Sequence, residues 1–217
     1  MNRFPPSLVS ACLAAASIGL LAACGATMPA TAPEQPATLT FATFGNSGEI
    51  TVQGGAIEAF AYSEKPGDAI LGTFATADGV ARVSGTIGAR NGSTWGGIAL
   101  MSAGGPDGKT IDLSKQRTLH IRLASASATQ LRVRVIGNDK ATRENGCYPV
   151  VVQKVTPELK DYAIPMSLFA PETYCAAQGR NIVDTAPAVT AIEVSDPTLS
   201  AAPRPANFQV GRIELRR

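Results

Sequence analysis

The chain has 217 residues, of which 19 are lysine or arginine and 17 are aspartate or glutamate, so its formal net charge is +2. Such an even balance gives no long-range electrostatic reason to expect nucleic acid as a partner. The length fits one domain with an adequate hydrophobic core, and the sequence contains no internal repeat.

The chain begins with an apolar run that follows an early basic residue. Arg3 precedes a stretch rich in leucine and alanine over residues 8–23, and small residues lead to Cys24. This pattern predicts a secretory signal peptide over residues 1–23. The run is short and alanine-rich for a membrane span, and no later segment of about 20 apolar residues follows it. We therefore expect the mature protein to be exported and not embedded in a membrane.

Residues 21–25, with the sequence Leu-Ala-Ala-Cys-Gly, resemble the lipobox of bacterial lipoproteins. The resemblance implies that Cys24 becomes the lipid-acylated first residue of the mature chain, carrying palmitate or a similar acyl group. Relatives retained in the inner membrane carry an aspartate where this chain has Gly25. The resemblance therefore implies a protein that is lipid-anchored to the bacterial envelope, in the outer membrane. The alternative is an ordinary signal peptide cut after Ala23 or nearby.

Residues 24–38 are rich in proline, alanine and threonine and show no apolar periodicity. We interpret them as a flexible tether between the lipid and a single folded domain at residues 39–217. Within that domain the cysteines are Cys147 and Cys175, an even pair in an exported chain. They predict one structural disulfide. A redox or metal site is disfavoured because the two cysteines are far apart in sequence and the single histidine, His120, has no obvious second ligand.

Short apolar and β-branched runs recur through the domain between turn signals, which is the pattern of an all-β protein. The turn signals are Gly54-Gly55, Pro66-Gly67, Asp78-Gly79, Asn91-Gly92, Pro106-Asp107-Gly108 and Asn145-Gly146. No helix-length stripe of apolar residues is present; residues 156–159 and 165–169 are the best candidates for single helical turns. Regular strand spacing predicts a sandwich or barrel.

Two segments alternate clearly between aliphatic and basic side chains: LHIRL at residues 119–123 and LRVRV at residues 131–135. Because side chains of a strand point alternately to its two faces, the aliphatic residues should be buried and the basic ones should share the opposite face. If the two strands are neighbours, those basic side chains form one patch. Its members are His120, Arg122, Arg132 and Arg134.

Several segments are similar, in order and spacing, to the galactose-binding-like jelly rolls, including the complex I intermediate-associated protein type and related carbohydrate-binding modules. They are residues 79–88, 95–101, 111–114, 119–123, 131–135 and 159–169. The resemblance covers most of residues 41–215 and implies an all-β jelly-roll sandwich. The chain departs from it at Leu159, where many relatives carry tryptophan, and at Ile57, where the aromatic that often follows the early glycine pair is missing.

Sugar recognition by such modules depends on an aromatic ring against the apolar side of a pyranose. We interpret Trp95, the only tryptophan, as a packing residue before a buried strand, with a ligand platform as the alternative. Tyr148 is the better ligand-binding candidate because the disulfide would hold it near a rim, although a half-buried structural tyrosine is also consistent with its position. Tyr62 and Tyr174 fall in expected loops and give only a hint.

The basic quartet has two interpretations. As a ligand site it would offer forked guanidinium donors to an acidic or hydroxyl-rich glycan. The favoured interpretation is a solvated strand face that discourages aggregation, with acids such as Asp112, Asp139 and Glu144 as ion-pair partners. No metal site is expected, although Asp107 and Asp112 beside glycine-rich turns could hold a structural calcium ion; turn aspartates otherwise serve Asx hydrogen bonds. No other cofactor is expected.

The sequence contains no nucleophile elbow, zinc-binding helix or phosphate loop, and its acids are scattered, so we expect no enzyme. Two functions remain. One is a membrane-anchored envelope lipoprotein with a non-catalytic carbohydrate-binding module, which predicts an exposed face with an accessible aromatic. The other is a structural or assembly lipoprotein that docks to another envelope protein, which predicts an exposed apolar patch instead.

Overall fold

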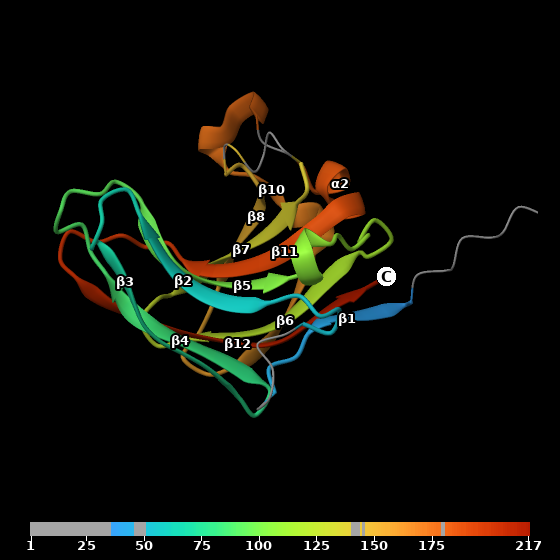
Figure 1. Ribbon diagram of the computed structural model, residues 1–217, viewed down its shortest axis with the longest axis horizontal. Coiled ribbons are helices and arrows are strands. Elements are labelled where there is room, and N and C mark those ends of the chain that lie inside the picture. The colour runs from blue at the N-terminus through green and yellow to red at the C-terminus, as the bar shows by residue number, and fades with distance from the viewer. Residues whose placement is uncertain (1–35, 46–50, 140–143, 145, 179–180) are drawn as a thin grey trace, which may run out of the picture. The chain divides into compact units, whose positions relative to one another are not determined.

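A computed structural model describes residues 36–45, 51–139, 144, 146–178 and 181–217. The predicted signal peptide, Cys24 and nearly all of the predicted tether lie outside these residues. The described chain from Pro36 onward belongs to one compact unit. Two six-stranded antiparallel sheets lie face to face, as Figure 1 shows. The prediction of an all-β sandwich is therefore confirmed.

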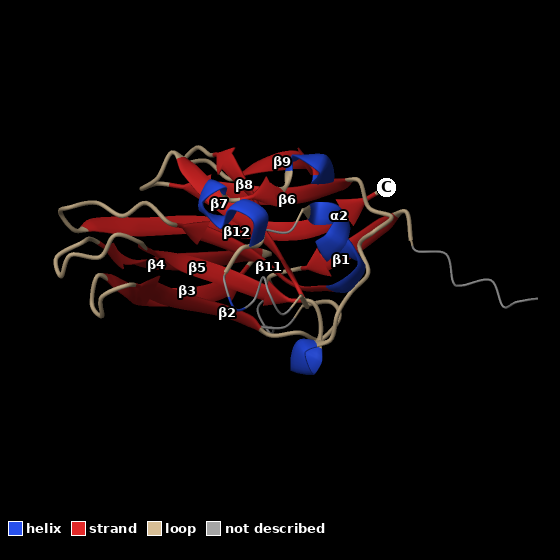
Figure 2. Ribbon diagram, turned by 90° about the horizontal axis from the view of Figure 1, so that it is seen from above, coloured by secondary structure: helices blue, strands red, loops and turns tan. Residues whose placement is uncertain are grey.

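We name each sheet after its central strand. The strands of the β12 sheet, in spatial order, are β3 (Ala69–Ala77), β4 (Val80–Ile87), β12 (Arg204–Arg216), β6 (Thr118–Ser125) and β9 (Lys160–Pro165), with β1 (Thr38–Ala42) also on β12. The strands of the β7 sheet are β10 (Ala170–Pro171), β8 (Pro149–Lys154), β7 (Gln130–Gly137), β11 (Val189–Asp196), β5 (Gly96–Ala103) and β2 (Ile57–Ser63). Figure 2 shows that the strands of both sheets lie along roughly the same axis, as in aligned sandwiches.

The helical elements in the described part of the chain are all short. They are the 3₁₀ turns η1 (Pro106–Gly108), η2 (Met166–Leu168), η3 (Thr173–Gln178) and η4 (Ala186–Ala188), and the α-helix α2 (Ile182–Thr185). The turn expected at residues 165–169 is present as η2, whereas residues 156–159 contain no helix. No described helix has the length and apolar character that a membrane crossing requires.

The long strand β12 holds one sheet together. Along one side it pairs with β6 from Phe208 to Arg216. On its other side its first half pairs with β4, and its second half pairs with β1. Two strands therefore lie end to end along one side of β12, and of these β4 also pairs with β3 on its other side.

Side-chain alternation builds the core between the sheets. The aliphatic residues of the two segments singled out from sequence are completely or almost completely buried, at 0–1% exposure; they are Leu119, Ile121, Leu123, Leu131, Val133 and Val135. Phe41, Phe44 and Phe208 add aromatic rings that are at most 1% exposed. Full burial of each such side chain stabilises the fold by about 1.5–3 kcal/mol before the entropic cost is counted.

Turn chemistry follows the glycine signals. Asp78 and Gly79 have φ values of 55° and 75°, and together they form the tight turn between β3 and β4. Positive φ at both central residues is the geometry that matches the twist of a hairpin, and Asp-Gly favours it. The turn signal expected from the sequence at Asp78-Gly79 is therefore confirmed, and the structure shows that it joins two paired strands.

One arrangement predicted conditionally from sequence is not formed. The segment 119–123 lies in β6 of the β12 sheet, and the segment 131–135 lies in β7 of the other sheet. Both segments bury their aliphatic side chains in the shared core, so their polar side chains point to opposite outer surfaces of the sandwich. The single basic patch of His120, Arg122, Arg132 and Arg134 is wrong because the two strands are not neighbours.

The predicted disulfide between Cys147 and Cys175 is present, with the two Cα atoms 5.6 Å apart. Strand pairing explains why these cysteines meet. Cys147 lies just before β8 and Cys175 lies shortly after β10, and these two strands pair with Pro149 opposite Pro171. The disulfide therefore joins two loops that leave the same end of a strand pair.

Candidate binding site

A pocket of about 600 Å³ opens on the outer face of the β7 sheet. Its lining combines three aromatic side chains with charged groups from widely separated parts of the sequence. The lining residues are Tyr62, Thr94, Trp95, Gly96, Arg132, Arg134, Gly146, Glu172, Tyr174 and Pro197. In Figure 1 the segment around β10 and η3 rises over this face, on the side away from the β12 sheet.

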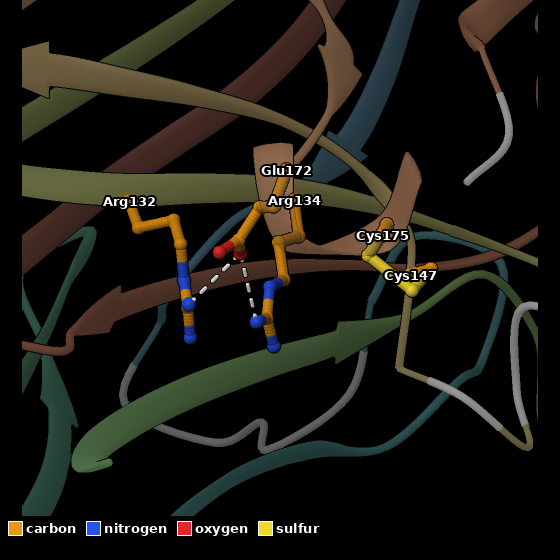
Figure 3. Close-up of a disulfide and its surroundings, with 5 residues drawn as sticks. All are labelled: Arg132, Arg134, Cys147, Glu172 and Cys175. Carbon is orange, nitrogen blue, oxygen red and sulfur yellow. Dashed lines mark hydrogen bonds and ion pairs between the residues drawn. A yellow bond between two sulfur atoms is a disulfide. The ribbon is translucent and has the colours of Figure 1, made fainter. Parts of the chain in front are cut away.

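Two arginines form the floor of the pocket. Arg132 and Arg134 alternate along β7 with core residues, so both side chains point outward. The Glu172 carboxylate accepts a hydrogen bond from each guanidinium through the same oxygen, Oε1, at 2.9 Å from Arg132 Nη1 and 3.0 Å from Arg134 Nη2. Figure 3 shows the two contacts converging on that carboxylate. Glu172, which follows β10, is thus hydrogen-bonded to both arginines of the floor.

The neighbouring strands complete this polar cluster. Ser195 and Glu193 of β11 lie opposite Arg132 and Arg134 in the β7–β11 register. Arg132 donates from Nε to Ser195 Oγ at 3.2 Å, and Arg134 donates from Nη1 to Glu193 Oε1 at 3.4 Å. From β2, the Tyr62 hydroxyl accepts a hydrogen bond of 2.6 Å from Arg132 Nη2. We call Tyr62, Arg132, Arg134, Glu172, Glu193 and Ser195 the polar cluster.

The polar cluster is largely removed from water. The exposed fractions of the Arg132, Arg134 and Glu193 side chains are 10%, 13% and 6%. Charges buried to this degree are tolerated in proteins when they are paired and hydrogen-bonded. The Nε atom of Arg134 is buried without a hydrogen-bond partner.

Burial and charge also shift the proton affinities of this cluster. Burial raises the pKa of the Tyr62 hydroxyl, although the charge of Arg132 acts in the opposite direction. Burial alone would lower the pKa of the Arg134 guanidinium, but the charge of Glu193 and the hydrogen bond to Glu172 outweigh it and raise that pKa. Tyr62 therefore remains a neutral phenol, and Arg134 a cation, at physiological pH.

One wall of the pocket is held by the disulfide. Glu172 and Tyr174 lie in the segment between β10 and Cys175, and Gly146 precedes Cys147. Figure 3 shows the disulfide beside Arg134 and Glu172. Tyr174 is 65% exposed, and burial together with the charge of Glu172 raises the pKa of its hydroxyl. The cross-link thus holds a carboxylate and an exposed aromatic ring against the arginine floor.

The opposite wall carries Trp95, whose position depends on contacts between the β2–β3 and β4–β5 loops. Asp68 accepts hydrogen bonds from the backbone N–H groups of Asn91 at 2.7 Å and Ser93 at 2.9 Å. Burial alone would raise the pKa of Asp68, but these hydrogen bonds hold it below its usual value. Glu64 accepts from both the backbone N–H and the hydroxyl of Thr94, each at 2.8 Å. The residues just before Trp95 are therefore fixed by two carboxylates.

The interpretation of Trp95 as a packing residue is wrong. Trp95 is 55% exposed and lines the pocket. Gly96 and Gly97 follow it in β5, and a Cβ atom on Gly97 would lie 2.6 Å from the Tyr62 hydroxyl oxygen and 2.9 Å from its Cζ. Gly97 therefore makes room for the aromatic side chain of the neighbouring strand.

The structure places the remaining predicted residues as follows. Arg132, Arg134 and Trp95 line the pocket together, whereas His120 and Arg122 lie on the outer face of the other sheet. Tyr148 is half-buried and does not line the pocket. The aromatic residue that lines the pocket beside the disulfide is Tyr174, which precedes Cys175.

Sequence reasoning missed the two glutamates that matter most. The acids paired with Arg132 and Arg134 are Glu172 and Glu193, not the acids proposed from sequence. The sequence did contain a signal for Glu193, because this residue lies between the apolar residues Ile192 and Val194. No local pattern singles out Glu172, whose role depends on the disulfide and on the pairing of β8 with β10.

Asp107 and Asp112 are the two residues that the sequence offered as possible calcium ligands. Within the described residues, no group of three or more His, Cys, Asp or Glu side chains is arranged to hold a metal ion. Asp107 lies in the η1 turn with a φ of 54°. The carboxylate of Asp112 accepts a hydrogen bond from the backbone N–H of Ser114 at 2.8 Å, which is the Asx arrangement considered as the alternative.

The described fold is similar to that of carbohydrate-binding modules. The family 11 module from Clostridium thermocellum, solved in complex with a β-1,3-1,4-mixed-linked tetrasaccharide, has 15% sequence identity and a TM-score of 0.51, over 82% of this chain and 96% of the module. The solution structure of CtCBM11 has 17% identity and a TM-score of 0.52, over 83% and 95% of the two chains. No protein-family model matches the sequence, and no curated protein matches it. These similarities show the class of fold, a jelly-roll β-sandwich that this chain shares with those modules.

Proposed function

We propose that this chain is a non-catalytic carbohydrate-binding module and that its ligand site is the pocket of the β7 sheet. The observation that carries the proposal is the convergence of Tyr62, Trp95 and Tyr174, from three separate segments, on one pocket with a polar floor. Exposure of large aromatic side chains costs hydrophobic free energy, so two that are more than half exposed at one pocket favour a ligand role.

The chemistry of the pocket suits a sugar. An aromatic ring can pack against the C–H face of a pyranose, while the carboxylate and guanidinium groups around it hydrogen-bond to hydroxyls. The pocket volume lies in the range typical of small-molecule sites. The related module solved with a mixed-linked β-glucan tetrasaccharide supports β-glucans as the first ligands to examine.

The arrangement of carboxylates favours binding over hydrolysis. Glycosidases use two acidic residues flanking the scissile bond, one of them as a proton donor. In the pocket the acidic groups are Glu172 and, beneath the arginines, Glu193, and both form ion pairs with Arg132 and Arg134. These glutamates therefore support a role in orienting the arginines.

Membrane anchoring through Cys24 is part of this proposal and is supported by the lipobox-like sequence alone. It places the module on a tether at the bacterial envelope, facing glycans or a glycan-processing partner. Metabolic labelling with an alkyne analogue of palmitate tests it: the wild-type chain should incorporate label into the membrane fraction, and Cys24→Ala should not. Equal labelling of the two chains would contradict lipidation.

Isothermal titration of the purified chain with soluble β-1,3-1,4-mixed-linked glucan and with cello-oligosaccharides tests the binding function. Trp95→Ala and Tyr174→Ala should each weaken binding about tenfold or more, because an aromatic contact is worth about 0.5–1.5 kcal/mol beyond its buried area. Ile70→Ala removes an equally exposed side chain from β3 of the other sheet and should leave affinity unchanged.

Binding of no polysaccharide in a broad screen would contradict the proposal. The assembly alternative then makes its own prediction: an envelope protein captured by the wild-type chain and lost with Trp95→Ala. The aromatic side chains at the pocket surround a charged floor, which favours the glycan.

A further inference from the structure

We infer that Glu172 sets the charge selectivity of the pocket, so that the site accepts neutral sugars and rejects uronic acids. The inference rests on the proposed glycan-binding function and reverses the acidic-glycan hypothesis drawn from the arginine-rich strand. It assigns a specificity-determining role to a residue in the loop that follows β10.

The charges of the polar cluster cancel. Its cations are Arg132 and Arg134, and its anions are Glu172 and Glu193. A floor that contains two guanidinium groups therefore offers no net attraction to an anionic ligand. The strand sequence LRVRV suggests a basic surface, but the polar cluster formed by the described residues has no net charge.

Glu172 already accepts a hydrogen bond from each of the two guanidinium groups. Arg132 uses Nε, Nη1 and Nη2 for Ser195, Glu172 and Tyr62, and Arg134 uses Nη1 and Nη2 for Glu193 and Glu172. Forked recognition of a carboxylate requires two parallel N–H groups of one guanidinium. A uronate that enters the pocket meets Glu172 beside these donors, and it would approach against that residue's negative charge.

Of the two glutamates, Glu172 faces the ligand. It lines the pocket and its side chain is 20% exposed, whereas Glu193 lies on β11 beneath the arginines with 6% of its side chain exposed. Removing the charge of Glu172 therefore changes the surface that a sugar meets and leaves the ion pair of Arg134 with Glu193 in place. Glutamine at this position keeps the size and a hydrogen-bond acceptor, and gives the cluster a net charge of +1.

The experiment compares ligands of one linkage with different charges. Cellotetraose, its C6-oxidised uronate form and the methyl ester of that uronate are titrated into the full chain. The wild type should bind cellotetraose and the methyl ester with similar affinity, and bind the free uronate at least about tenfold more weakly, a difference of roughly 1.4 kcal/mol. With Glu172→Gln the uronate should bind at least as well as cellotetraose, and its affinity should fall as salt is added.

Two variants serve as matched controls. Glu172→Asp keeps the charge and should still discriminate against the uronate. Glu214→Gln makes the same substitution at a glutamate that also contacts two arginines, Arg212 and Arg216, but on β12 of the other sheet, and it should bind the three ligands as the wild type does. Thermal melts check that each variant is folded, and the methyl-ester comparison tests the inference in the wild type without any variant.

The outcomes separate the inference from the function it rests on. If the wild type binds none of the three sugars, the proposed function is contradicted and this inference falls with it. If the wild type binds cellotetraose but accepts the free uronate equally well, or if Glu172→Gln discriminates as strongly as the wild type, the glycan function stands and the role of Glu172 is overturned.

Discussion

The two outer faces of the sandwich carry the same motif in different surroundings. On the β7 sheet, Arg132 and Arg134 meet at one glutamate, Glu172; on the β12 sheet, Arg212 and Arg216 meet at Glu214. Loops and a disulfide border the first group, and the arginine side chains are 10% and 13% exposed. The arginines of the second group are 55% and 45% exposed.

The comparison shows that surroundings, and not the motif, decide what a charged strand face does. Exposed ion pairs contribute little to stability because water screens them and their long side chains lose entropy. Buried pairs make each partner depend strongly on the other, since removing one leaves an uncompensated charge in a poorly hydrated place. The buried group lines the pocket of about 600 Å³, whereas Arg212 of the exposed group borders a hollow of about 440 Å³.

The largest expected difference between the two faces is in stability. Arg132→Ala removes the guanidinium that donates hydrogen bonds to Glu172, Ser195 and Tyr62. It should lower the free energy of unfolding by about 3–5 kcal/mol. Arg122→Ala on β6 removes an ion pair to Asp161 whose atoms are 3.7 Å apart and whose side chains are 41% and 82% exposed, and should cost about 1 kcal/mol or less. Urea denaturation of both variants measures the difference; equal losses would show that enclosure does not matter.

The disulfide holds a wall of the pocket on the β7 sheet, and the β12 sheet has no counterpart among the described residues. Replacing Cys147 and Cys175 by alanine should lower the free energy of unfolding by about 3–4 kcal/mol in the chain-entropy account. It should also weaken glycan binding, because Glu172 and Tyr174 lose their covalent link to the floor. Calorimetry gives the first quantity and titration the second. Unchanged binding would mean that ion pairs alone hold this wall.

Alkaline pH probes the burial of the polar cluster. Because the pKa of Tyr62 is raised above its ordinary value of 10.0, the folded state holds that proton more tightly than the unfolded state does. The resulting stability is fully present below pH 10 and is lost as the pH rises through the folded-state pKa. Tyr62→Phe should flatten this alkaline loss, while Tyr162→Phe on β9 of the other sheet should not; identical pH profiles of the two variants would contradict the assignment.

The smallest effect is expected on the exposed face. Asp161→Asn removes the charge partner of Arg122 and should change the free energy of unfolding by about 0.5 kcal/mol or less. Denaturation at low and high salt measures it. A larger, salt-resistant loss would show that this face is better enclosed than its exposed fractions indicate.

The strand framework could be predicted from local sequence because its physical causes are local. Alternation in LHIRL and LRVRV predicted which side chains are buried, and Asp78-Gly79 predicted the turn that joins β3 to β4 in the structure. The disulfide followed from the count of cysteines. The sheet to which each strand belongs depends on pairing over long distances, so β6 and β7 could not be separated by pattern alone.

The site was only half predictable for the same reason. Arg132 and Arg134 were found because they interrupt an aliphatic strand at period two. Glu172 meets them only after β10 pairs with β8, and Trp95 is exposed only because Asp68 and Glu64 fix the loop that precedes it. No spacing rule connects residues that are brought together by separate tertiary contacts.

The position of β12 has a consequence for how the molecule is made. This strand follows all the others in the sequence, yet it lies at the centre of its sheet and pairs with β1, β4 and β6. Before residues 204–216 have been synthesised, β1, β4 and β6 lack the strand with which all three pair. The sandwich can therefore close only after those residues have been added. Until then we expect the chain to remain unfolded or to be bound by a chaperone, because the apolar faces of those strands would otherwise be exposed to water.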